Sequence, residues 1–416
     1  MEIIIVPSEI RGSVTAPPSK SMTQRAIAAA LLSKGESTIV NPSFCDDSLA
    51  AINIASGLGA EVQNKINHLI IKGSGNIKKQ TLDCGESGLA IRMFSPIAAL
   101  NDKKITMTGT GSLKKRPMTM IEDALRQLKV NCTTSEGYLP LTISGPLKGG
   151  NCTIDGSVSS QLLTGLLMAL PVAEKSSEIT VMNLKSKPYV DMTLQVLEQF
   201  EISIDKTGYS HFKIKGNQKY RAQKFEVESD WSGGAFLLVA GAINGEIIVN
   251  GLRPDTRQSD SAILTILDNA GVRTSIRDNS IGVMKSKLRA FEFDATESPD
   301  LFPPAVALAS YCTGISSIKG VSRLVHKESD RARALIEEFE KINIKIEITD
   351  DNMLVTGGKV KGGHVHSHGD HRIAMAAAVA TLGASGRIHI KDSHCVNKSF
   401  PGFFEDLRHL GTLVYE

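Results

Sequence analysis

Positively charged side chains recur along this chain where helices are expected to begin. Lys20 and Arg25 lie in PPSKSMTQR (17–25), which opens an apolar helix. Free backbone NH groups and the helix dipole favour an anion at such an end, and the cations add full charges. Later helix starts repeat the arrangement with Arg116, Lys327, Arg331, Arg372 and Lys398. Because these starts hold too few nearby carboxylates to neutralise their cations, the pattern predicts a small substrate with several negative charges.

Uncharged donors stand at two of these helix starts. Ser21 lies in the first, and GSVSSQLLTG (156–165) holds Ser159, Ser160 and Gln161. Hydroxyl and amide groups suit a phosphate or a polyol. For each start taken singly, a capped surface helix with solvated cations is the alternative.

Two carboxylates stand out among these cations. Asp300, in ESPDLFPP, precedes an apolar helix. It either caps that helix or serves as a base or hydroxyl ligand. Glu328 either pairs with Arg331, three residues further on, or donates a proton.

The sequence gives only weak evidence for a metal site or a nucleotide-binding site. His364, His366 and His368 alternate as on one face of a strand. No carboxylate or cysteine completes a set of ligands there at the usual spacing. The chain has no GxxxxGK[ST] loop and no GxGxxG after a strand. We therefore expect no metal ion, no cofactor and no nucleotide hydrolysis.

The composition of the chain limits its expected partners and its expected location in the cell. The 416 residues are 41% hydrophobic and 22% charged, with a net charge of +3. So small a charge argues against nucleic-acid or membrane partners. The six cysteines form no CxxC pair, which is typical of reduced thiols. With no leader sequence and no apolar run of membrane length, the chain is expected to act in the cytoplasm, and we expect a monomer.

One unit of roughly 70 residues is repeated six times. Each copy opens with a polar turn and an apolar helix, and a second, amphipathic helix follows. The first helices start at Ser19, Gly85, Ser157, Ser229, Ser298 and Gly369. The second helices start near Asp46, Pro117, Pro188, Ser259, Glu328 and Phe400.

Several first helices are apolar on almost every side, for example IAMAAAVATL from Ile373, so they should be buried all round. Short branched runs such as Ile247–Val249 read as strands, which must then lie outside. The pattern predicts an α/β protein of two inside-out barrel domains, each of three βαβαββ-type repeats. We expect one domain over residues 15–227 and a second over 1–14 plus 228–416, with the substrate site in the cleft between them.

Eight segments, in order and over essentially the full length, resemble the motifs of the 5-enolpyruvylshikimate 3-phosphate (EPSP) synthase family. They are PPSKSMTQR, SLKKRPM, DGSVSSQLLTGLLMALP, SKPYVDMT, SPDLFPP, HKESDRARA, GDHRIAMA and NKSFPGFFEDL. The resemblance implies transfer of the enolpyruvyl group of phosphoenolpyruvate to shikimate 3-phosphate, in the shikimate pathway to the aromatic amino acids. It also implies two inside-out barrels and a target for glyphosate.

Carried over to this chain, the resemblance implies two sets of binding residues. Shikimate 3-phosphate would contact Lys20, Ser21, Arg25, Ser159, Ser160, Gln161, Ser186, Tyr189, Asp300 and Lys327. Phosphoenolpyruvate would contact Lys20, Gly88, Arg116, Gln161, Arg331, Arg372 and Lys398.

The same resemblance implies the order of events. The 5-hydroxyl of shikimate 3-phosphate loses its proton to Asp300 or Lys20 and attacks C2 of phosphoenolpyruvate. Glu328 protonates C3, and the tetrahedral intermediate then loses phosphate. Neighbouring cations favour the ionised form of Glu328, so its role as an acid requires desolvation to prevail.

Three positions depart from the family pattern. Glu86 and Leu89 flank Gly88 where the family commonly has Asn and Thr, and Arg323 stands where many members have Asn. An acidic Glu86 near an anion site should pair with a neighbouring cation.

Two other functions are compatible with parts of this pattern. A related enzyme transfers enolpyruvyl to a UDP-sugar, but it carries a reactive cysteine in the loop that corresponds to Thr108–Arg116, which has none here. A non-catalytic anion-binding protein would need the cations but not Asp300 and Glu328 together.

Overall fold

The computed structural model describes residues 1–73, 75–325 and 327–416. These residues form two compact units, one of Met1–Pro17 with Glu228–Glu416 and one of Pro18–Val227. His326, within the motif HKESDRARA, lies outside the described residues. No helix that the structure describes combines the length and the apolar composition that crossing a bilayer requires.

The unit Pro18–Val227 holds twelve strands in three four-stranded sheets. The strands are β3 (Glu36–Val40), β4 (Glu61–Lys65), β5 (His68–Lys72), β6 (Thr81–Asp83), β7 (Lys104–Thr108), β8 (Asn131–Ser135), β9 (Tyr138–Ser144), β10 (Asn151–Asp155), β11 (Ser177–Met182), β12 (Asp205–Thr207), β13 (His211–Ile214) and β14 (Lys224–Glu226). Their orders are β14-β3-β5-β4, β6-β7-β9-β8 and β10-β11-β13-β12. In each sheet the first pair is parallel and the others are antiparallel.

Six α-helices and two 3-10 turns connect these strands. They are α1 (Lys20–Leu32), α2 (Asp46–Gly57), α3 (Gly88–Ala98), η1 (Gly111–Lys115), α4 (Thr119–Gln127), α5 (Gln161–Ala169), η2 (Leu170–Val172) and α6 (Lys187–Gln199). Helix α3 links the parallel strands β6 and β7, and α5 links β10 and β11, because a parallel pair needs a crossover connection. In the third sheet, β3 pairs with β14 from the far end of the unit. The hairpins β4–β5, β8–β9 and β12–β13 complete the sheets, which gives the predicted βαβαββ order.

The other unit repeats this plan with twelve further strands. They are β1 (Glu2–Ile5), β2 (Ile10–Thr15), β15 (Gly245–Asn250), β16 (Arg273–Arg277), β17 (Ser280–Met284), β18 (Glu292–Asp294), β19 (Ile315–Lys319), β20 (Lys345–Thr349), β21 (Asn352–Thr356), β22 (Gly363–His366), β23 (Ile388–Lys391) and β24 (Val414–Tyr415). Their orders are β16-β17-β15-β2, β18-β19-β21-β20 and β22-β23-β1-β24.

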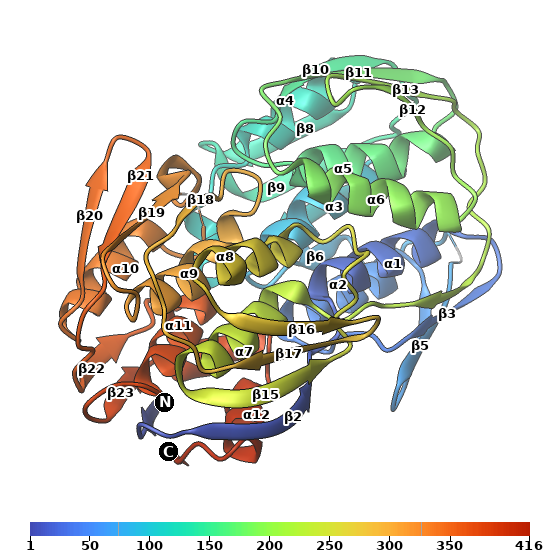
Figure 1. Cartoon of the computed structure of the whole chain (residues 1–416). Coiled ribbons are helices and arrows are strands. Elements are labelled where there is room, and N and C mark those ends of the chain that lie inside the picture. The colour runs from blue at the N-terminus through green and yellow to red at the C-terminus, as the bar shows by residue number, and fades with distance from the viewer. Residues whose placement is uncertain (74, 326) are drawn as a thin grey trace. The chain divides into compact units, whose positions relative to one another are not determined.

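The helices of this unit follow the same alternation. They are α7 (Trp231–Asn244), η3 (Ser259–Ala262), α8 (Ile263–Asn269), η4 (Pro299–Leu301), α9 (Phe302–Ala309), η5 (Val321–Arg323), α10 (Arg331–Glu340), α11 (His371–Thr381), η6 (Ser393–Lys398) and α12 (Phe403–His409). The first helices α7, α9 and α11 lie side by side, with β15 and β17 along α7 (Figure 1).

Helices fill the interior of each unit, as the sequence predicted. All residues of α3 and of α11 are buried. The strands alternate instead, as in β11, where Ser177, Ile179 and Val181 are buried and the residues between them are exposed. One face of each sheet therefore packs on the helices and the other faces solvent. The predicted α/β class and the six helix pairs are confirmed.

The N-terminal segment forms two strands, β1 and β2. β1 pairs antiparallel with β23, whereas β2 pairs parallel with β15 in a different sheet. Pro7 lies between them, where a residue without an NH group ends a ladder of hydrogen bonds. The sheets of the unit that contains residues 228–416 are thus completed from the other end of the chain.

Candidate functional site: cations at helix starts and buried carboxylates

A buried carboxylate and three cations meet at the start of α9. Asp300 Oδ1 accepts hydrogen bonds from Lys327 Nζ (3.2 Å) and Arg331 (2.9 Å). Its other oxygen, Oδ2, lies 3.1 Å from a guanidinium nitrogen of Arg372. Burial alone would raise the pKa of Asp300, but the charges of Arg372, Lys327 and Arg331 hold it well below its ordinary value. Asp300 is therefore ionised at neutral pH.

Arg331 is fully buried and contacts three carboxylates. Its Nε donates to Asp370 (2.9 Å), and its two terminal nitrogens reach Asp300 (2.9 Å) and Glu328 (2.7 Å). Burial alone would lower the pKa of Arg331, but these carboxylates raise it above the ordinary value. The sequence analysis expected too few nearby carboxylates to neutralise the cations of this helix start. In the structure Asp300 and Asp370, which come from two other helix starts, join Glu328 beside Arg331.

Asp370 is a site residue that the sequence analysis missed. It is fully buried and caps α11, where its Oδ1 accepts the backbone NH of Arg372 (2.9 Å). The same carboxylate accepts from Ser329 Oγ (3.1 Å) and from Arg331. Its position directly before a predicted helix was the available signal, since Asp is a preferred N-cap residue.

The remaining cations of this unit lie in buried positions as well. Burial lowers the pKa of Lys327, and the charges of Arg331 and Arg323 act in the same direction while Asp300 opposes them. Lys398 ends η6 and is only 5% exposed. A cation of low exposure favours an anion that can replace its lost water.

A second buried carboxylate, Asp260, lies in η3. It accepts hydrogen bonds from the hydroxyls of Ser232 and, at 3.1 Å, Ser259. Burial, and next the charge of Asp300, raise the pKa of Asp260 to about 6, while the charge of Arg372 opposes them. The unit thus places a carboxylate that titrates near neutral pH beside the ionised Asp300.

In the unit Pro18–Val227, Arg25 is a buried cation surrounded by neutral oxygens. Its Nε donates to Thr193 Oγ1 (3.0 Å), and its terminal nitrogens donate to the carbonyls of Ser21 (2.8 Å) and Tyr189 (3.2 Å) and, weakly, to Thr164 (3.4 Å). Among the described residues no carboxylate pairs with Arg25. Burial lowers the pKa of Arg25 to about 10.

Lys20, in the first turn of α1, lies 3.1 Å from Asp47 in the first turn of α2. The side chains are 13% and 7% exposed. A carboxylate at this distance stabilises the ammonium form of the lysine. Asp47 is a partner of Lys20 that the sequence analysis did not indicate.

Three side chains converge on Gly88 at the start of α3. A Cβ atom on Gly88 would lie 2.6 Å from a terminal nitrogen of Arg116, 2.9 Å from one of Arg92 and 3.5 Å from Gln161 Oε1. Arg92 donates to Gln161 Oε1 at 2.9 Å. Arg92 was missed by the sequence analysis, although an arginine inside the apolar run GLAIRMFSPIA was a visible signal. The absence of a side chain at Gly88 lets two guanidinium groups approach the start of α3 closely.

The other predicted residues of this unit also occupy helix starts. Ser159 Oγ accepts the backbone NH of Gln161 (3.1 Å), and Ser160 is buried directly before α5. Ser186 precedes α6 with φ +58°, a left-handed conformation that is costly for serine. Such strain clusters at ligand sites. Tyr189 lies in the first turn of α6, where its carbonyl meets Arg25.

The sequence of the chain is similar to those of known proteins. The family model of EPSP synthase (3-phosphoshikimate 1-carboxyvinyltransferase) matches residues 5–407. The chain belongs to the EPSP synthase family. A curated 3-phosphoshikimate 1-carboxyvinyltransferase of Clostridium kluyveri is 40% identical, covering 100% of this chain and 98% of the relative, and one of Clostridium perfringens is 38% identical, covering 100% and 99%.

A solved structure shows the same fold. EPSP synthase from Acinetobacter baumannii matches with a TM-score of 0.84 and 26% identity, covering 100% of both chains. Members of this family transfer the enolpyruvyl group of phosphoenolpyruvate to shikimate 3-phosphate. The chain is accordingly a transferase of the shikimate pathway.

Two departures from the EPSP synthase pattern have structural explanations. Glu86 Oε2 accepts hydrogen bonds from the backbone NH (3.3 Å) and the hydroxyl (2.8 Å) of Ser112. Glu86 thereby fixes the η1 turn that leads to Arg116. Leu89 is 7% exposed and belongs to the apolar core of its unit.

All six cysteines are unbridged thiols, as predicted, and five are buried. Burial raises the pKa of Cys84, the cysteine that precedes Gly85, above its ordinary value. A thiol held in its neutral form is a poor nucleophile. This agrees with the EPSP synthase reading rather than with an enzyme that depends on a reactive cysteine.

The titration of Asp260 predicts a pH-dependent gain of stability for Asp260→Asn. Because its folded pKa of about 6 exceeds the ordinary 3.8, Asp260 destabilises the fold increasingly as pH rises from about 4 to about 6. The asparagine carries no such penalty, so above pH 6 the variant should gain about 1–3 kcal/mol relative to wild type. Denaturant unfolding at pH 4.5, 5.5 and 7.5 measures this, with the exposed Asp123→Asn as control. An equal difference at every pH would contradict it.

The Glu86–Ser112 tether predicts an effect on phosphoenolpyruvate binding. Glu86→Ala and Ser112→Ala should each raise KM for phosphoenolpyruvate roughly threefold to tenfold, because a charged hydrogen bond that fixes the Arg116 turn is lost. The double variant should lose no more than either single variant. The control is Thr134→Ala, which removes the same kind of tether to Glu122 elsewhere. Additive effects would exclude the tether.

Proposed function

We propose that the helix-start residues described above bind the two substrates of enolpyruvyl transfer. Arg25 carries this proposal, because a buried guanidinium among neutral oxygens has an uncompensated charge. An anionic substrate group supplies the missing charge. Shikimate 3-phosphate then contacts Lys20, Ser21, Arg25, Ser159, Ser160, Gln161, Ser186, Tyr189, Asp300 and Lys327.

Phosphoenolpyruvate in this proposal uses Lys20, Gly88, Arg116, Gln161, Arg331, Arg372 and Lys398. We add Arg92 to this set, because it reaches the same space beside Gly88 as Arg116. Guanidinium forks suit a ligand with one carboxylate and one phosphate. A side chain at Gly88 would displace these guanidinium groups, so the glycine supports binding of a compact anion such as phosphoenolpyruvate or glyphosate.

Asp300 is the better candidate for the group that accepts the 5-hydroxyl proton. It is ionised, whereas Lys20 lies beside a carboxylate that stabilises its ammonium form. Asp300 is a weak base while Arg372 and Lys327 hold its charge. Substrate anions that bind these cations weaken that hold and raise the proton affinity of Asp300.

Glu328 is proposed to protonate C3 of phosphoenolpyruvate by the same logic. Its carboxylate is 2.7 Å from Arg331, which favours the ionised form. Binding of the substrate carboxylate to Arg331 competes with this pair and makes the protonated form of Glu328 accessible. The hydroxyl oxygen attacks C2 to form the tetrahedral intermediate. A proton of C3 then returns to the carboxylate of Glu328 as phosphate leaves C2, which restores the carbon–carbon double bond, and the arginines and Lys398 stabilise the charge of the phosphate.

The direct test is phosphate release from phosphoenolpyruvate. Release should require shikimate 3-phosphate and should not occur with a UDP-sugar as acceptor. Phosphate release with the UDP-sugar alone would favour the related enzyme that transfers enolpyruvyl to a UDP-sugar. No phosphate release with either acceptor would favour an anion-binding protein.

We also propose that the chain acts as a cytoplasmic monomer on these small molecules.

The two carboxylates have separate expected effects on turnover. Asp300→Asn and Glu328→Gln should each lower kcat by about 10²–10⁴-fold, the usual contribution of a general base or acid. Asp294→Asn, an exposed carboxylate paired with Lys319, is the matched control and should retain kcat.

Steady-state kinetics with both substrates varied separate binding from chemistry. Near-normal turnover of Glu328→Gln would remove its role as the acid. Near-normal turnover of Asp300→Asn would indicate that Lys20, rather than Asp300, accepts the proton of the 5-hydroxyl.

A further inference from the structure

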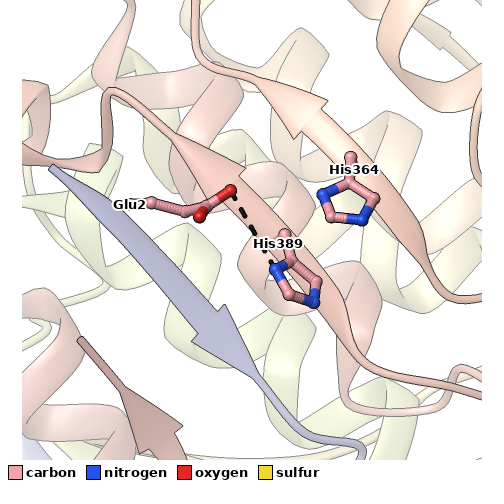
Figure 2. A group of neighbouring side chains, drawn as sticks. All are labelled: Glu2, His364 and His389. Carbon is pink, nitrogen blue, oxygen red and sulfur yellow. Dashed lines mark ion pairs between the residues drawn. The ribbon is translucent and has the colours of Figure 1, made fainter.

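Three metal-ligand side chains gather on the outer face of the sheet β22-β23-β1-β24. They are Glu2 on β1, His389 on β23 and His364 on β22 (Figure 2). The register explains the grouping, because His364 lies opposite His389 in the parallel pair. His389 lies opposite Ile4 in the antiparallel pair, which places Glu2 diagonally beside it on the same face.

The three groups are close enough to share one ion. His389 Nδ1 is 4.0 Å from Glu2 Oε1, and the centroids of the two imidazole rings are 4.2 Å apart. One ligand atom from each residue lies within 4.8 Å of the others. On the opposite face Ile3, Ile390 and their neighbours are buried, so the backbone that sets this spacing is fixed by the core.

We propose that Glu2, His364 and His389 bind a divalent transition-metal ion of the Zn²⁺ type. Two imidazole nitrogens and one carboxylate suit Zn²⁺, Co²⁺ or Ni²⁺ rather than Mg²⁺ or Ca²⁺, which require oxygen ligands. Metal–ligand bonds of about 2.0–2.2 Å require the ligand atoms to approach further. All three side chains are at least partly exposed and can rotate to do so. Water fills the remaining positions.

The neighbouring histidines and carboxylates have other partners. Glu337, Glu338 and His368 also lie close together. Both oxygens of Glu338 are within 2.8 Å of Lys341, and Glu337 pairs with Arg333, so cations already occupy these carboxylates.

His366 is directed to a different partner, Asp392, 3.5 Å away. The alternating histidines of the sequence therefore do not form one ligand set. His364 finds its ligand partners on two other strands, which a search for close spacing along the chain could not reveal.

Lys391 opposes the proposed site. It lies directly across from Glu2 and next to His366 on the same face. A nearby ammonium repels a divalent cation, so Lys391 should weaken binding without removing a ligand. Removal of the charge of Lys391 should therefore tighten metal binding, whereas removal of a ligand should weaken it.

The bound ion would join three strands that include the N-terminal strand β1. Because β1 belongs to a sheet formed otherwise by the distant segments β22, β23 and β24, a bridge of this kind links the two ends of the chain. Binding to the folded state alone raises stability by mass action. The ion has no part in the transfer of the enolpyruvyl group.

The test uses the full chain with a histidine-free tag, stripped of metal by a chelator. Zn²⁺ titration by calorimetry and Co²⁺ titration by visible absorption should show one site per chain, and Mg²⁺ should not compete. Glu2→Gln, His364→Ala and His389→Ala should each weaken binding at least about tenfold. Lys391→Gln should tighten it about threefold or more.

Matched controls separate this site from others. His368→Asn, in the neighbouring group, and His211→Asn, an exposed histidine in the other unit, should bind as wild type does. Equal unfolding temperatures of all variants with excess chelator establish that the substitutions leave the fold intact. Zn²⁺ should raise the unfolding temperature of wild type but not of His364→Ala.

Three results would overturn the proposal. The first is absence of saturable Zn²⁺ binding by wild type up to about 1 mM. The second is binding that survives in the His364→Ala/His389→Ala double variant. The third is binding lost in His368→Asn but retained in His364→Ala, which would assign the ion to the other group.

Discussion

The buried guanidinium of Arg331 is the interaction on which one half of the site depends. A charge without water must be matched by opposite charges, and Asp300, Glu328 and Asp370 supply them. Asp300 and Glu328 belong to the two helix starts of one repeat and Asp370 to the next repeat, so this single side chain links two repeats of its unit. Loss of any one carboxylate would leave a buried charge that is only partly compensated.

The two units solve the problem of buried charge in different ways. Around Arg331 the carboxylates outnumber the guanidinium, whereas Arg25 is held by neutral oxygens alone. The first arrangement is stable by itself and can exchange partners with an anion. The second is costly until an anion arrives. In the proposed mechanism both properties are used, since Arg25 attracts one substrate and the carboxylates that move protons are released from their cations.

The repeated fold explains why so many charged groups occupy helix starts. The parallel pairs β6–β7, β10–β11, β18–β19 and β22–β23 are each linked by one crossover helix, which begins after the first strand of the pair. Helices α3 and α11 are largely apolar, and their buried arginines, Arg92 and Arg372, stand near the first turns. Polar chemistry is therefore confined to one end of an otherwise apolar helical core, where backbone NH groups are available.

The sequence by itself determined the six repeats, the burial of the helices and the helix starts at which cations occur, because these depend on local patterning. It did not determine which charges meet. Arg331 reaches Asp370 39 residues away, and Glu86 meets Ser112 across 26 residues. His364 and His389 become neighbours only through strand register. Such partners are decided by packing between repeats, because a side chain interacts with whatever is near in space, and spacing along the chain carries no record of that distance.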